Sequence, residues 1–64
     1  MDEHKALKEI YRLERLKKKY EAALEDYQAI DEPSDSQAEM IAAIEANIRE
    51  AETLIDGLQV YLLV

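Results

Sequence analysis

The second half of this 64-residue chain repeats aliphatic side chains at alternating steps of three and four. These positions are Ile41, Ile44, Ile48, Ala51, Ile55, Leu58 and Leu62. Such spacing places the side chains in one nearly straight stripe along a helix, as in the seam of a coiled coil. The first half carries a looser stripe of the same kind, formed by Ala6, Leu13, Leu16, Tyr20, Ala23, Tyr27 and Ile30. We therefore expect two amphipathic helices that pack against each other.

Residues 31–36, with the sequence Asp-Glu-Pro-Ser-Asp-Ser, have the composition of a turn. Pro33 disfavours helical geometry at the preceding residue, so the first helix should end near residue 30 or 31. We predict an all-α fold, a single antiparallel, coiled-coil-like hairpin with helices at about 3–31 and 35–62 and a turn at 31–35.

The start of the second helix has two candidate caps. Ser34 with Gln37, or Ser36 with Glu39, can form a capping box in which each side chain bonds the backbone N–H of the other residue. We favour Ser34 as the cap.

A hairpin of this length buries little surface on its own, and the chain has no cysteine for a disulfide. We therefore expect self-association, as a dimer first of all, in which two hairpins form a four-helix bundle or a larger helical oligomer. The surplus apolar residues near the end opposite the turn are the predicted interface, with a copy of the chain or with another protein. These residues are Leu7, Ile10, Tyr11, Leu54, Leu58, Tyr61, Leu62, Leu63 and Val64.

Charge is distributed unevenly along the chain. The net charge is −7, yet seven of the eight Lys and Arg residues lie within the first 19 positions. Five residues of this segment could bind an anion such as RNA or a nucleotide, with one aromatic ring for stacking: Lys8, Tyr11, Arg12, Arg15 and Lys19. The alternative, which we favour, is that the second helix neutralises these cations, since the hairpin register brings Arg12 and Lys19 to the heights of Glu52 and Glu45.

Tyr11 separates these two interpretations. As part of an anion site its ring would stack on a base, whereas beside Leu7 it would pack in an interface. We expect the packing role.

Catalytic chemistry has few candidate residues here. His4 is the one histidine and has no cysteine partner, and a single glycine excludes a glycine-rich phosphate loop. We expect no enzymatic activity, no cofactor and no metal site. The chain begins without an apolar leader and contains no run long enough for a membrane span, so we expect a cytoplasmic protein that does not interact with membranes. The predicted function is a small acidic protein-interaction module that acts as a regulator, inhibitor or adaptor, with RNA or nucleotide binding as the alternative and a purely structural assembly unit third.

Overall fold

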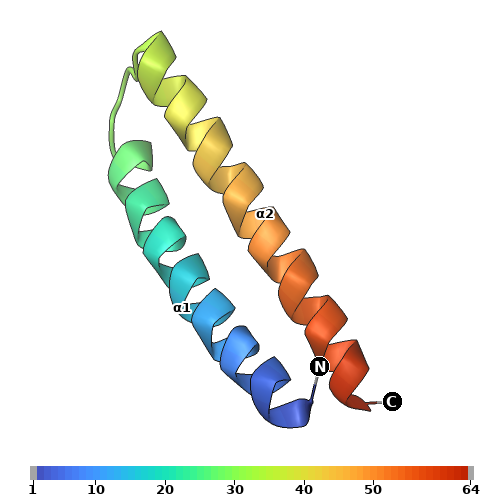
Figure 1. The fold of residues 1–64 in the computed structure, drawn as a ribbon. Coiled ribbons are helices and arrows are strands. Elements are labelled where there is room, and N and C mark those ends of the chain that lie inside the picture. The colour runs from blue at the N-terminus through green and yellow to red at the C-terminus, as the bar shows by residue number, and fades with distance from the viewer. Residues whose placement is uncertain (1, 64) are drawn as a thin grey trace.

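The computed structural model describes residues 2–63, which form two helices joined by a short connection. Helix α1 spans Glu3–Gln28 and helix α2 spans Asp35–Leu63. The helices run side by side in opposite directions, so that both ends of the chain lie at the end of the hairpin opposite the turn (Figure 1). The result is a rod of 46 × 14 × 14 Å. The predicted antiparallel two-helix hairpin is confirmed.

Helix α1 begins at a side-chain cap and ends earlier than predicted. The Asp2 carboxylate accepts a hydrogen bond of 2.8 Å from the backbone N–H of Lys5, which satisfies a free donor of the first turn. At the other end the helix stops at Gln28 rather than near residue 30 or 31. The last turn has no basic residue, whereas the acidic Asp26 lies in it and Asp31 follows. Negative charge at a helix C-terminus is unfavourable, which explains the early end.

Helix α2 begins with the predicted capping box. The backbone N–H of Ser34 donates to Gln37 Oε1 at 2.8 Å, and the backbone N–H of Gln37 donates to Ser34 Oγ at 3.2 Å. The prediction that Ser34 caps the helix is therefore confirmed. The capping box satisfies two backbone N–H groups at the start of α2 that have no partner within the helix.

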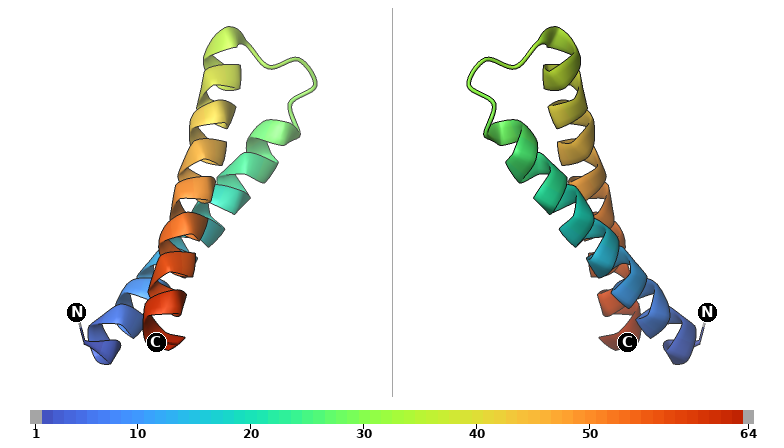
Figure 2. Two further views of the ribbon diagram at one scale, coloured as in Figure 1. Left: turned by 90° about the vertical axis from the view of Figure 1, so that its right-hand side faces the viewer. Right: turned by 90° about the vertical axis from the view of Figure 1, so that its left-hand side faces the viewer.

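The core lies in the half of the hairpin that is remote from the turn. Ile10, Leu13 and Ile55 form a buried cluster, and Leu58 and Leu62 pack against it. The two ribbons cross toward this end and separate toward the turn (Figure 2). Near the turn one predicted seam residue, Ile44, is buried. The others there are only half-buried, at Tyr20, Ala23, Tyr27, Ile30, Ile41 and Ile48. Within residues 2–63, neither helix contains an apolar stretch that could span a bilayer.

Candidate functional site: an apolar face and a basic hollow

Helix α2 carries a second stripe of large side chains that the hairpin does not cover. Met40, Leu54 and Tyr61 are 48%, 49% and 47% exposed, and with the half-buried Asn47 they occupy every seventh position of the helix. Seven residues make almost two turns of an α-helix, so these four side chains lie on one side of α2, next to the buried seam. We call them the α2 stripe.

A groove between the helices adjoins the α2 stripe. Its volume is about 180 Å³, and its walls are Arg12, Leu13, Leu16 and Tyr20 of α1 and Asn47, Glu50, Ala51 and Leu54 of α2. We call the α2 stripe together with Leu16 and Tyr20 the apolar face. It combines exposed apolar surface with the amide side chain of Asn47, and the charged Glu50 lies beside it in the wall of the groove.

The opposite side of the hairpin is charged. There the depression between the helices is lined mainly by polar residues, among them Glu14, Lys17 and Lys18 of α1 and Asp56 of α2. The two sides of the interhelical plane therefore differ in chemistry. Apolar surface for a partner is concentrated on one of them.

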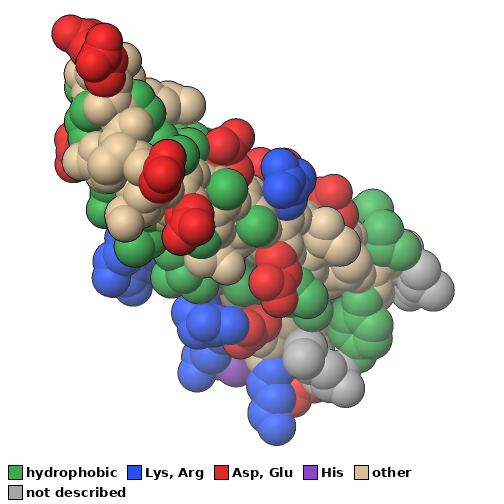
Figure 3. All heavy atoms as spheres, turned by 90° about the horizontal axis from the view of Figure 1, so that it is seen from above, with side chains coloured by type: hydrophobic (Ala, Val, Ile, Leu, Met, Phe, Trp, Pro, Cys, Tyr) green, Lys and Arg blue, Asp and Glu red, His purple; other side chains and the backbone are tan. Residues whose placement is uncertain are grey.

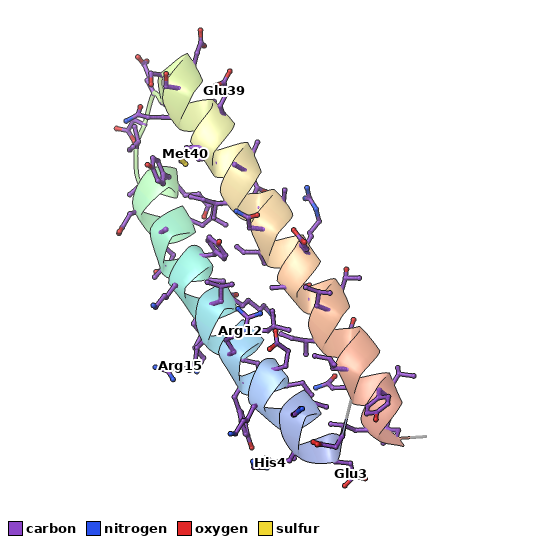
Figure 4. The ribbon with its side chains drawn as sticks, viewed as in Figure 1. Glu3, His4, Arg12, Arg15, Glu39 and Met40 are labelled. Atoms are coloured by element: carbon purple, nitrogen blue, oxygen red, sulfur yellow. The ribbon has the colours of Figure 1, made fainter. Side chains whose placement is uncertain are left out.

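The five predicted anion-binding residues come together on α1, next to the groove of the apolar face, with which they share Arg12. A shallow hollow of about 340 Å³ on α1 is lined by Lys8, Tyr11, Arg12, Arg15, Leu16 and Lys19. We call it the basic hollow. Tyr11 is 62% exposed. Most of the visible Lys and Arg side chains gather along one side of the molecule in Figure 3, and Arg15 projects away from α2 in Figure 4.

Arg12 is engaged within its own helix rather than with α2. Its Nε atom donates a hydrogen bond of 3.0 Å to Glu9 Oε1, and its terminal amino group also contacts that oxygen. This hydrogen bond lowers the pKa of Glu9 and raises the pKa of Arg12. Across the hairpin, Glu52 pairs with Lys17, with 3.6 Å between Nζ and Oε1. Among residues 2–63 these are the two ion pairs, so Glu52 of α2 does neutralise one cation of α1, but that cation is Lys17, and neither Arg12 nor Lys19 pairs with an acid of α2.

The structure divides the predicted interface residues into two groups. Leu7, Tyr11, Leu54, Tyr61 and Leu63 are exposed, whereas Ile10, Leu58 and Leu62 are packed in the core of the hairpin itself. Val64 lies outside the described residues. Met40 and Asn47 were not predicted as interface residues, although the spacing of seven that joins them to Leu54 and Tyr61 is visible in the sequence.

Metal-ligating side chains do not cluster in the described part of the chain. Residues 2–63 contain no cluster of three or more His, Cys, Asp or Glu side chains that could hold a metal ion. His4 is exposed in the first turn of α1 (Figure 4).

Comparison with known proteins finds no family, no curated protein and no solved structure that matches this chain. The apolar face and the basic hollow are therefore the two candidate binding surfaces of residues 2–63.

Proposed function

We propose that this chain is a protein-interaction module that works by binding rather than by catalysis, and that its first partner is a second copy of itself. The observation that supports the proposal is the α2 stripe, a heptad row of large side chains left half-exposed beside the seam that already joins the helices. A heptad row of this kind is the surface that one helix offers to another.

Energetics favour covering this surface. Within residues 2–63 the hairpin buries six side chains, and two of them are alanines. Covering the exposed half of Met40, Leu54 or Tyr61 contributes on the order of 1 kcal/mol per side chain. In a symmetric dimer every contact occurs twice, so the same face supplies this contribution from both copies. Two hairpins packed through their apolar faces make a four-helix bundle.

Asn47 gives the proposed interface its specificity. A single polar residue in a heptad seam stabilises arrangements in which its amide finds a partner and disfavours others. Asn47 lies in the middle of the α2 stripe, between Met40 and Leu54. A helix of another protein with a matching polar residue could replace the second copy, and in this way the module would act as a regulator, inhibitor or adaptor.

The test is the mass of the particle in solution. Sedimentation equilibrium at micromolar concentration should give at least twice the 7.4 kDa of one chain. Leu54→Glu places a carboxylate in the stripe and should reduce the mass to that of the monomer, because a buried unpaired charge is costly.

Val60→Glu is the matched control. Val60 is 60% exposed and lies on another side of α2, so the same kind of substitution there should leave the mass unchanged. A folded wild-type monomer would contradict self-association. Equal effects of the two substitutions would show that the stripe is not the interface.

A further inference from the structure

We propose that the basic hollow is a binding site for a nucleoside phosphate, either free or within single-stranded RNA, in which Tyr11 stacks on the base and Arg15 and Lys19, one helical turn apart, hold the phosphate, while Lys8 adds positive charge on the other side of the ring. This inference does not depend on the proposed self-association, because it rests on the outer side of α1. The four cations of the hollow recur at steps of four, three and four along the helix, as Lys8, Arg12, Arg15 and Lys19. They therefore form a row about 16 Å long.

The charges of the hollow are free to bind a ligand. Among the ion pairs of residues 2–63, none involves Lys8, Arg15 or Lys19. Arg12 shares its guanidinium with Glu9 but has five N–H donors, so donors remain after that contact. The guanidinium of Arg15 and the ammonium group of Lys19, one helical turn apart, match the geometry and charge of a phosphate.

Tyr11 adds to the hollow an exposed aromatic ring, which a site for simple anions would not contain. Its ring is 62% exposed and is not part of the buried cluster of the hairpin. An exposed aromatic ring between cations is a platform on which a base can stack while its phosphate is held. The hollow has a volume of about 340 Å³ and is shallow, so it would contact a ligand from one side.

The net charge of −7 does not prevent binding at this site. Salt screens charges over about 10 Å at 0.1 M. From Lys19 to the end of α1 the helix rises by about 14 Å, and the acidic turn lies beyond it. The lining of the hollow itself contains four cations and no acid, so a ligand confined there meets local positive charge. A long polyanion would extend toward the acidic regions, so the site favours a nucleotide or a short strand.

Isothermal titration of the full chain with AMP, with inorganic phosphate and with a short single-stranded RNA tests the proposal. AMP should bind more tightly than phosphate, and binding of all three should weaken as salt is raised. Tyr11→Ala should weaken AMP and RNA binding by about 5- to 150-fold and leave phosphate binding unchanged. RNA binding much tighter than AMP binding would identify RNA as the source of the nucleotide, and equal affinities would identify the free nucleotide.

Arg15→Glu should abolish binding of all three probes, and Arg49→Glu is its control. Arg49 is an exposed arginine of α2 outside the hollow, so the same change of charge there should leave affinity within about twofold. Arg12 and Leu16 are avoided as test positions because they also line the groove of the apolar face.

Three outcomes would overturn the proposal. The first is no binding of AMP or RNA at low salt. The second is an equal loss from Arg15→Glu and Arg49→Glu, which would show that only net charge matters. The third is that Tyr11→Ala lowers the particle mass without ligand, which would place Tyr11 in a protein interface. A monomeric wild-type protein that still binds AMP would refute self-association and leave this proposal standing.

Discussion

Lys17 of α1 and Glu52 of α2 form the ion pair that joins the two helices within residues 2–63, with 3.6 Å between Nζ and Oε1. Both side chains remain partly in solvent, at 32% and 50% exposure. Exposed ion pairs contribute little to stability because water and salt screen them. The helices are therefore held together mainly by apolar packing.

Glu52→Gln should lower the free energy of unfolding by less than about 1 kcal/mol, since it removes only this exposed pair. The loss should shrink further at high salt. Urea unfolding of both proteins at low and high salt checks this prediction. A loss of several kcal/mol, independent of salt, would show that Glu52 has a structural role beyond the pair with Lys17.

Leu13→Ala should cost about 2–5 kcal/mol, because Leu13 is 3% exposed in the core cluster and truncation leaves a cavity. Leu24→Ala is the matched substitution in the half of α1 near the turn, where the side chain is half-buried, and should cost clearly less. Thermal unfolding followed by circular dichroism measures both. Equal losses would mean that Leu24 is covered in solution, as it would be if a partner packed against that half of the hairpin.

Asn47→Leu should strengthen self-association and allow more than one oligomer to form. Leucine completes the apolar α2 stripe, which raises the melting temperature, but it also removes the polar group that disfavours other alignments. Sedimentation velocity should then show several oligomers where the wild type shows one. An unchanged single species would show that Asn47 does not lie in the interface.

The Glu9–Arg12 hydrogen bond predicts a small pH dependence of stability. It lowers the pKa of Glu9 in the folded state, so its contribution is present above the pKa of the unfolded chain and is lost as the pH falls through the lowered value. Glu9→Gln should therefore be slightly less stable than wild type at neutral pH, and the difference should vanish in acid. Unfolding at several pH values tests this, and an NMR titration that places Glu9 at the ordinary carboxyl pKa would contradict it.

The hairpin and its second cap could be predicted because both depend on local sequence. The heptad seam of α2 requires a partner helix, and Ser34 and Gln37 have the spacing of a capping box. The end of α1 could not be predicted from Pro33 alone, because that residue restricts only its own neighbourhood. Unfavourable charges near the C-terminus of α1 end the helix earlier.

Burial along the seam was harder to predict. Periodicity treats Leu13 and Tyr27 alike, but Leu13 is buried and Tyr27 is only half-buried. The reason is that the two helices separate toward the turn (Figure 2). The crossing angle depends on how side chains of both helices interlock, which the spacing of one helix does not contain.

The two surfaces of the candidate site differ in how far the sequence predicted them. The basic hollow was predictable because all its residues lie on one helix, where spacing determines which side they share. The salt-bridge partner of Arg12 was not predictable, because its long side chain can reach either Glu9 in its own helix or an acid across the hairpin. The apolar face was only partly predictable, since Met40 lies far from the end of the hairpin where surplus apolar residues were expected.

The position of the core also determines how the chain must fold. The best-packed contacts, between Ile10 and Ile55 and their neighbours, join residues separated by most of the sequence, whereas the contacts nearest the turn are the loosest. Folding cannot gain much from contacts next to the turn and must close a long loop before the main apolar contacts form. The entropy of that closure grows slowly, by about 0.6 kcal/mol for each doubling of loop length, so the cost is moderate. Most of the apolar stabilisation of this hairpin is therefore gained only when its distant ends meet.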